Sequence, residues 1–538
     1  MRSKNYTILL TEIITIFLMV FNILPREAAW FLTGILVFYF LFSPLEDSLW
    51  VFIASIPLFV ALPITETFDS MSNWRLLLVI LFLVWLKEML GSRPPTFLYK
   101  RSGLPHRLII LTSIFLGLGV LSLLNAVNLF VGAKKLLYFI NIFMLFFALK
   151  TVVRDEKSLL KIFRAVWIAL GLALIVGYAQ FIAVFFAPLY TFWQFWAGKV
   201  IPVFYGQGLG KLLSYSNTWF SYYDSQPPTL RMFSVFPDSH SFSLFLIIGL
   251  PFLLTMILSR PKEKRKLLFV GYLVLIIIFL TLIFSGSRGI WVSALTLLAL
   301  LLIFILTSVF SRWRKRRVGA APIKLEPLQL KIPQLIFGSL IIFFLLFPIS
   351  SWFLLLSQKA QLKDSALSED LFLVFERAKS ITDLTEISAR SRLEIWQRTI
   401  DSIAAHPILG VGLGNYPIIL REDVSAAKRG ASAHNLYFEI MSEMGIFALL
   451  VLLAMFWEVL KTALSIGGLP SVKSGGGQTS AVSVIWAGFF GLVFIWILIY
   501  SLFDVVLLND KVFLFFIANL GLLYAAKSAH GFHQSPNL

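Results

Sequence analysis

Three arginines of this chain lie where an anionic ligand would explain them. Arg288 stands in the short polar turn 285–289 between two apolar runs, Arg231 precedes another apolar run, and Arg392 lies in a long polar stretch. A guanidinium group offers a planar fork of N–H donors that fits the oxygens of a phosphate or carboxylate. The three residues therefore predict an anion site, with the phosphate of a lipid headgroup as the simpler alternative partner.

A histidine and two acids follow one another in a helical pattern. His434 precedes an apolar run, and Asn435, Glu439 and Glu443 recur at intervals of four, which places them on one face of a helix. Histidine titrates near neutral pH, so His434 can take a proton from a hydroxyl group, although it can also simply cap the helix. Acids within a membrane span are candidates for function, with a structural hydrogen bond to a neighbouring helix as the alternative.

The polar stretch around Arg392 contains a predicted helix. Ser391 and Glu394 have the spacing of a capping box, and apolar residues follow at helical intervals until Pro407. A helix that begins at Ser391 would hold Arg392 in its first turn, where free backbone N–H groups and the helix dipole favour an anion. An amphipathic helix that lies on the membrane surface without a ligand is the alternative.

The composition indicates which elements must hold these residues. Of the 538 residues, 58% are hydrophobic and 14% are charged, whereas soluble domains have about 25% charged residues. A run of about 20 apolar residues crosses a bilayer, and the chain has about fourteen such runs. We therefore predict an all-α integral membrane protein with about fourteen transmembrane helices. The net charge of +18 indicates loops that face anionic lipid, and we expect no nucleic-acid partner.

The positions of Lys and Arg between the apolar runs predict the orientation. These residues gather in alternate short loops, such as 260–266 and 312–317, and loops of this kind stay in the cytoplasm. Both termini are then cytoplasmic. The polar stretches 188–240 and 357–434 face outward with the turn that carries Arg288, so every candidate residue lies on the outer side or just beneath it.

The outward stretches carry no recognisable metal or nucleotide motif. Gly410, Gly412 and Gly414 follow no predicted strand, and no GK[ST] sequence completes a phosphate loop. These stretches contain no D-x-D or H-E-x-x-H sequence and no cluster of carboxylates, and the chain has no cysteine. We therefore expect no bound metal, no cofactor and no disulfide.

Several segments together resemble the O-antigen ligase and O-antigen polymerase (Wzy-type) superfamily of bacterial membrane glycosyltransferases. They are Ser391-Arg392 through Trp396, the sequence HPILGVGLGNY at 406–416, His434-Asn435 followed by nine residues before Gly445, the turn 285–289, and Arg231 with Phe236. The resemblance covers roughly residues 231–445. Asp238-Ser239-His240 stands where the family often has Pro-Asn, and Val292 stands where ligases often have Leu, so the subfamily stays open.

The resemblance implies a GT-C-like glycosyltransferase of the bacterial inner membrane with its active site on the periplasmic face. Its donor would be a glycan on undecaprenyl diphosphate. In ligases the acceptor is the lipid A core, in polymerases it is the terminal sugar of another lipid-linked repeat unit, and in further relatives it is a protein serine or threonine. The ligase reaction is our first expectation, with the polymerase and the protein O-oligosaccharyltransferase as alternatives.

The apolar runs and the polar stretches between them divide the chain, and the resemblance assigns roles to its residues. Five parts follow: transmembrane helices at 1–187, a first long periplasmic loop at 188–240, transmembrane helices at 241–356, a second long periplasmic loop with an amphipathic helix at 357–434, and transmembrane helices at 435–538 with a cytoplasmic linker near 467–477. The diphosphate-binding residues would be Arg231, Arg288 and Arg392. The acceptor-side, catalytic residue would be His434, and possible supporting residues are Asn435, Glu439 and Asp238.

The chemistry of the expected reaction is consistent with these roles. A glycosyl diphosphate already has a good leaving group, so the protein needs cations that stabilise the departing phosphates rather than a general acid. The acceptor hydroxyl must lose a proton, and His434 is the candidate base. These requirements favour a metal-independent single displacement with inversion.

A transporter or flippase for the same lipid-linked glycan is the alternative from another class. Such a protein should carry ionisable residues near the middle of several spans. In this chain they gather at the outer ends, with Glu12 and Glu443 as the main exceptions.

Overall fold

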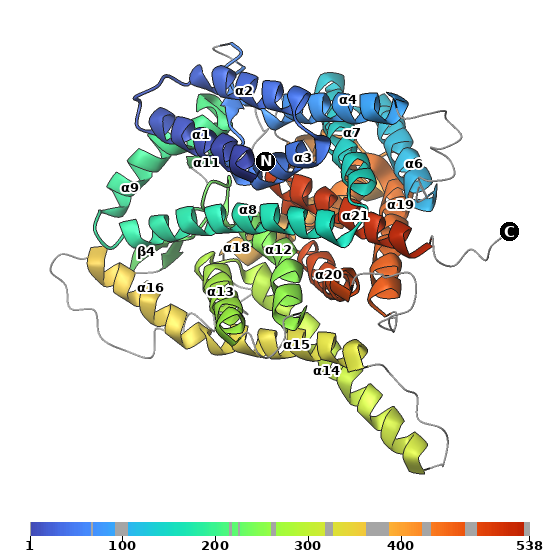
Figure 1. Cartoon of the computed structure of the whole chain (residues 1–538). Helices are drawn as coiled ribbons and strands as arrows, with labels where there is room; N and C mark the ends of the chain where they lie inside the picture. The colour runs from blue at the N-terminus through green and yellow to red at the C-terminus, as the bar shows by residue number, and fades with distance from the viewer. Residues whose placement is uncertain are drawn as a thin grey trace.

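The computed structural model shows the chain as an assembly of helices (Figure 1). It describes residues 2–65, 68–91, 106–214, 218–223, 226–259, 265–317, 327–361, 387–421, 432–468 and 481–531. The α-helices are α1 Arg2–Val20, α2 Ala28–Phe42, α3 Leu45–Ala54, α4 Trp74–Gly91, α6 His106–Ser122, α7 Leu129–Val152, α8 Glu156–Ala183, α9 Leu189–Phe195, α10 Ile201–Tyr205, α11 Gln207–Ser214, α12 Ser239–Ser259, α13 Arg265–Phe284, α14 Arg288–Arg317, α15 Pro327–Leu345, α16 Phe347–Gln361, α18 Ile387–Ala405, α19 Leu436–Gly467, α20 Ala481–Tyr500 and α21 Asp510–Gly531.

Short helical turns and two small hairpins complete the described elements. The 3-10 turns are η1 Ile56–Leu58, η2 Leu123–Asn125, η4 Tyr416–Leu420 and η5 Val506–Leu508, and η3 Trp196–Val200 is a π-helical turn. The strands are β1 Ala61–Leu62, β2 Met71–Ser72, β3 Phe220–Tyr223 and β4 Gln226–Leu230. Each hairpin pairs its two strands in antiparallel fashion, β1 with β2 and β3 with β4.

The long apolar helices make this a multi-pass membrane protein. Within the described ranges, nine helices are long and apolar enough to cross a membrane: α6, α7, α8, α12, α14, the α15 and α16 pair, α19, α20 and α21. Shorter apolar helices lie at Ala28–Phe42 and Leu268–Phe284. The predicted helical membrane fold is confirmed, whereas the number of about fourteen spans and the GT-C-like architecture stay predictions.

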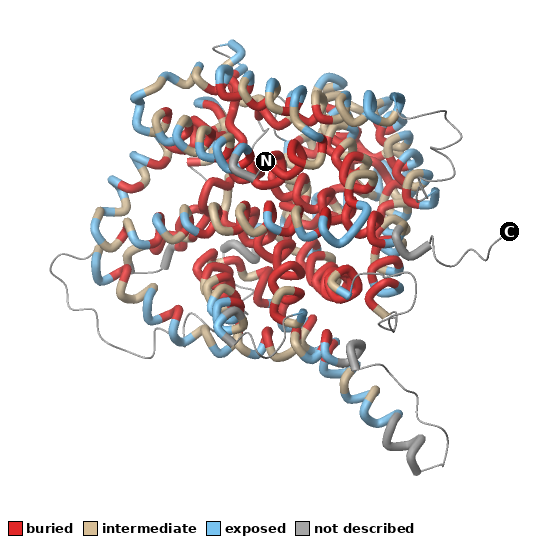
Figure 2. Tube along the Cα trace, in the orientation of Figure 1, coloured by how far each residue is buried: buried red, intermediate tan, exposed pale blue. Residues whose placement is uncertain are grey.

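Three helices form the centre of the bundle (Figure 2). In the most apolar windows of α12, α21 and α20, 89%, 83% and 72% of the residues are buried, against 28% in α6 and α7. α19 packs on α20 at a pair of glycines, because a Cβ on Gly467 would lie 2.4 Å from the Cα of Gly488. Small residues allow membrane helices to approach this closely. α6 and α7 instead expose apolar side chains, as lipid-facing helices do.

The apolar run from Trp50 to Ile64, one of the roughly fourteen counted as possible spans, is not a single helix. α3 ends at Ala54, and η1 and β1 follow it. Two hydrogen bonds join Asn73 to Val60. The side-chain oxygen of Asn73 accepts the N–H of Val60 at 3.1 Å, and the backbone N–H of Asn73 donates to the carbonyl of Val60 at 2.8 Å. The apolar residues of this run are buried inside the protein. A continuous apolar run looks the same in the sequence whether it forms such a buried segment or a membrane span.

The predicted outward stretches have structure of their own. The stretch 188–240 carries α9, η3, α10, α11 and the β3–β4 hairpin. The stretch 357–434 carries α18 and η4. Its residues 362–386 and 422–431 lie outside the described residues, as do residues 469–477 of the predicted linker.

Candidate functional site

Arg231 lies directly beside the turn that carries Arg288. Arg231 follows β4, and its Nε donates to the Ser221 hydroxyl at 2.8 Å. The N–H of Met232 donates to the carbonyl of Phe284, the last residue of α13, at 3.1 Å. Gly286 has φ +64°, and a Cβ on it would lie 3.2 Å from Nε of Arg231. The structure therefore brings together two arginines that are far apart in sequence.

Arg288 is the first residue of α14, at the end of that turn. The N-terminus of a helix carries a partial positive charge, so an arginine there is opposed by the helix dipole unless an anion is near. The neighbouring Ser287 is buried, and its hydroxyl lies 3.1 Å from that of Tyr500 at the end of α20. α20 thereby joins the Arg288 turn to the rest of the site.

Arg392 lies on α18, but not where the sequence predicted. α18 begins at Ile387, one turn before Ser391, so the prediction of a helix start at Ser391 is wrong and Arg392 is not in the first turn. Residues 388–390 contain no helix breaker, and nothing stops the helix from extending towards the N-terminus. Arg392 still reaches the site, because its charge acts on His434 and on Asp504.

His434 is held in an uncommon backbone conformation just before α19. Its φ is +47°, which few residues other than glycine adopt. Two hydrogen bonds hold the backbone of the preceding residue, Ala433. Its N–H donates to Oε2 of Glu439 at 2.9 Å, and its carbonyl accepts Nε1–H of Trp396 at 2.9 Å. Asn435 caps the helix by accepting the N–H groups of residues 437 and 438. The alternative that His434 is the cap is therefore wrong.

The side chain of His434 faces an environment that disfavours its charged form. Burial lowers its pKa, the carboxylate of Asp504 acts in the opposite direction, and the charges of Arg392 and His240 lower it further. Its Nδ1 is buried and has no hydrogen-bond partner among the described residues. His434 therefore stays neutral near pH 7, and its catalytic role stays a prediction.

The two acids of α19 have a partner on α7. Nζ of Lys135 lies 2.7 Å from Oε2 of Glu443 and 3.8 Å from Oε1 of Glu439. Both carboxylates are buried, so a cation is needed to stabilise them. This contact favours the structural alternative for Glu443, whereas Glu439 also positions the backbone before His434. The prediction had not included Lys135.

A buried, hydrogen-bonded pair of His240 and Asp504 is a further part of the site that the sequence did not predict. His240 is at the start of α12, and its Nδ1 lies 2.5 Å from Oδ2 of Asp504, which follows α20. Burial opposes ionisation of Asp504, but the charge and hydrogen bond of His240, with His434 and Arg392, lower its pKa to about 2. The charges of Asp504, Arg392 and His240 all act on His434, so these groups form one cluster.

Asp238, predicted as a supporting residue, caps α12 beside this pair. It accepts the N–H of Ser241 at 2.7 Å and the hydroxyl of Ser241 at 2.7 Å, and Asn509 donates to it at 3.3 Å. Burial raises its pKa, His240 opposes that shift, and Asp504 adds to it. Its contacts are those of a helix cap that also borders the cluster.

The described residues contain no group of three or more His, Asp or Glu side chains placed to hold a metal ion. The acids near the cluster have other partners: Asp504 pairs with His240, Asp238 caps α12, and Glu439 and Glu443 pair with Lys135. Their oxygens are therefore used in holding the helix ends together.

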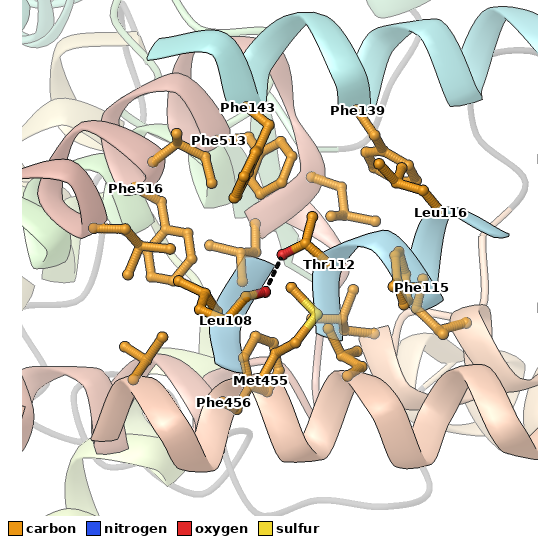
Figure 3. A pocket seen from close by; sticks show the side chains of 18 residues that line it. Leu108, Thr112, Phe115, Leu116, Phe139, Phe143, Met455, Phe456, Phe513 and Phe516 are labelled. Carbon is orange, nitrogen blue, oxygen red and sulfur yellow. Dashed lines mark hydrogen bonds between the residues drawn. The ribbon is translucent and has the colours of Figure 1, made fainter. Parts of the chain in front are cut away.

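An apolar cavity lies beneath the cluster, between α6, α7, α19 and α21 (Figure 3). Its volume is about 90 Å³, and among the described residues Thr112 is the one polar side chain of its lining. The Thr112 hydroxyl is already used, since it donates to the carbonyl of Leu108 at 2.8 Å. Leu436 and Leu507 belong to its lining, and they follow His434 and Asp504 by two and three residues. A hydrocarbon chain fits the chemistry of this cavity.

A comparison with protein families found a match that includes α18 and residues on both sides of it. Residues 273–453 match the O-antigen ligase family model. This match confirms the resemblance to the O-antigen ligase superfamily. A comparison with curated proteins found no match to the chain.

The O-antigen ligase region, residues 273–453, is about a third of the chain and contains only part of the cluster. Arg288, Arg392 and His434 lie inside it. Arg231 and His240 precede it, and Asp504 follows it. The site therefore depends on helices on both sides of the O-antigen ligase region.

Proposed function

We propose that the chain is an inner-membrane glycosyltransferase that moves a glycan from undecaprenyl diphosphate to an acceptor hydroxyl on the periplasmic face. The observation that carries this proposal is the cluster at the outer helix ends, where Arg392, His434 and Asp504 act on one another beside the Arg231 and Arg288 turn. The O-antigen ligase region favours the lipid A core as the acceptor.

The arginines supply what a diphosphate leaving group requires. Negative charge grows on the bridging oxygen as the sugar departs, and guanidinium groups already in place stabilise that charge without rearrangement. In this proposal Arg231 and Arg288 bind the two phosphates from the β4 and α14 sides, and Arg392 approaches from α18. No general acid is needed, because the leaving group departs as an anion.

The acceptor side of the proposed site is the face with the histidines. The hydroxyl oxygen attacks the anomeric carbon from the side opposite the diphosphate, so the configuration inverts in a single step. His434 stands at this side, held by Glu439 and Trp396 through Ala433. A metal ion has no part in the proposed reaction.

The cavity beneath the cluster supports a lipid-linked donor. Its lining begins just below His434 and Asp504 and continues between membrane helices. A polyprenyl chain placed there would hold its diphosphate near the arginines, and burial of apolar chain stabilises binding by roughly 0.8 kcal/mol per CH₂. The orientation we propose puts the cluster in the periplasm and both termini in the cytoplasm.

Glu12 and Glu443, the two acids whose positions would fit a transporter, have local partners. Glu12 accepts the hydroxyl of Ser55 at 2.5 Å, and Glu443 pairs with Lys135. These contacts anchor α1 and α19 to neighbouring elements, as structural acids do.

The decisive experiment is transfer in nanodiscs from a purified undecaprenyl-diphosphate glycan to lipid A core. We expect a glycan-bearing lipid A product and released undecaprenyl diphosphate. Formation of a longer lipid-linked glycan without lipid A core would make the chain a polymerase. Movement of intact donor across the bilayer, with no transfer to either acceptor, would overturn the proposal in favour of a flippase.

A further inference from the structure

The C-terminal end of α20 is bonded to the start of α14, the helix that begins with Arg288. The hydroxyl of Tyr500, the last residue of α20, lies 3.1 Å from the hydroxyl of Ser287, the residue before Arg288. Closer to the middle of α20, Nε1–H of Trp496 donates to the Ser293 hydroxyl at 2.9 Å. The four side chains that make these two contacts are buried. They hold α20 against the helix that presents the arginine.

The start of α14 also packs directly on the ring of Tyr500. Gly289 follows Arg288, and a Cβ on it would lie 3.0 Å from Cε2 of Tyr500 and 3.0 Å from Cβ of Phe503. A larger residue would push the backbone away from the ring, so glycine permits this close approach. Removal of the Tyr500 hydroxyl would therefore leave this packing in place and take away the contact with Ser287.

The same end of α20 holds the start of α19, next to His434. The N–H of Leu436 donates to the carbonyl of Ser501 at 2.9 Å, and the Tyr437 hydroxyl donates to the carbonyl of Leu498 at 2.9 Å. A helix leaves its first N–H groups and its last carbonyls without partners of its own. These bonds satisfy such groups on both helices, and they join α20 to the helix that follows the candidate acceptor histidine.

α20 therefore contacts both the helix of the predicted diphosphate residue and the helix of the predicted acceptor residue. We propose that Tyr500 is a positioning residue, which through Ser287 fixes the place of Arg288 relative to His434. This inference rests on the proposed glycosyl transfer. In a single displacement the attacking and leaving oxygens stand on opposite sides of the anomeric carbon. The separation of the residues that bind them thus determines how often the reacting atoms are aligned.

The test removes one oxygen atom and keeps the ring. Tyr500→Phe, as the full-length protein in nanodiscs, is compared with wild type for donor affinity and for a single turnover at saturating donor. The amplitude of that turnover counts the folded, active molecules, and its rate constant reports the geometry inside them. Tyr524→Phe is the matched control, because Tyr524 is equally buried and lies near the far end of α21.

We expect Tyr500→Phe to keep donor affinity, because the contact between Arg231 and the Arg288 turn does not involve Tyr500. Its rate constant should fall roughly 10- to 100-fold, since a misplacement of about 1 Å between reacting groups can cost that much. Tyr524→Phe should match wild type. Ser287→Ala removes the other half of the contact and should show the same loss as Tyr500→Phe. The double variant should be no slower than either single variant, because the second substitution has no contact left to remove.

Two results would overturn the inference. A lower amplitude with an unchanged rate constant in Tyr500→Phe would show that the hydroxyl only stabilises the fold. Losses in rate that multiply in the double variant would show that the two hydroxyls act independently. If Tyr500→Phe did not fold, an unchanged rate constant in Ser287→Ala would contradict the inference as well. Absence of transfer by the wild type would instead count against the proposed function.

Discussion

Lys135 and Glu443 form an ion pair, with 2.7 Å between Nζ and Oε2, across 308 residues of sequence. The pair joins α7 to α19 directly below the residues that hold His434. Glu439, one turn away, takes part in the same group and accepts the N–H of Ala433. A change on α7 can therefore alter the backbone next to the candidate histidine.

We expect Lys135→Met to destabilise the protein by about 3 kcal/mol or more, because it leaves the buried carboxylate of Glu443 without its cation. Lys134→Met is the matched control, since Lys134 lies over the ring of Phe130 at 3.9 Å and contacts neither acid. Its effect should be below about 1 kcal/mol. Thermal unfolding in detergent measures both. Equal losses for the two variants would show that the pair contributes nothing specific.

Arg288→Ala should weaken donor binding and slow turnover together. A charge-assisted hydrogen bond to phosphate contributes about 1.5 to 3 kcal/mol, and more as charge grows on the leaving group. Arg288→Lys keeps the charge but not the bidentate fork, so it should recover activity only in part. Donor titration and single-turnover rates in nanodiscs measure the effects. Unchanged donor affinity in Arg288→Ala would remove Arg288 from the diphosphate site.

Chelation should leave the transfer rate unchanged. The proposed site stabilises the diphosphate with arginines, so excess EDTA removes nothing that the reaction uses. The assay compares rates with and without EDTA, followed by addition of magnesium or manganese. A loss that either metal restores would point to ligands among Asp238, Glu439 and Glu443.

The stability of the protein should fall as the pH is lowered through about 6.5, in part because of His434. Its pKa is lowered in the folded state by burial, so the unfolded chain binds the proton first and unfolding takes up a proton in this range. His434→Gln cannot take up that proton and should lose less stability between pH 7 and pH 5. Thermal unfolding at each pH measures the difference. Parallel curves for the two proteins would show that His434 is not shielded from protonation.

The orientation can be tested because the chain has no native cysteine. Lys211→Cys and Lys157→Cys form a matched pair, since both lysines are exposed. Lys157 lies in the first turn of α8, and Lys211 lies on α11, in the stretch that follows the other end of α8. Lys211→Cys should react with an impermeant maleimide in intact spheroplasts, and Lys157→Cys should react only after lysis. The reverse pattern would place the cluster on the cytoplasmic face.

The parts of the fold that local sequence determines could be predicted. Long apolar runs gave the membrane helices, and Asn435 at the start of an apolar run gave the beginning of α19. The turn at 285–289 and its arginine were also placed correctly at a helix end. Each of these features depends on neighbours in sequence.

The parts that depend on distant neighbours could not be predicted. The run that begins at Trp50 is as apolar as a span, and only its packing inside the protein shows why the helix stops at Ala54. Ser391 has the spacing of a cap, yet the helix continues past it. His240 and Asp504 stand 264 residues apart, and no motif connects them before the fold does.

The position of Asp504, in the turn after α20, has a consequence for anyone who builds hybrid enzymes. A transplant of residues 273–453 into a relative would move Arg392 and His434 but leave behind Asp504, His240 and Lys135. The recipient would then supply its own groups around a foreign histidine. A hybrid designed to change acceptor choice should therefore carry α7, the start of α12 and the last two helices together with the transplanted segment.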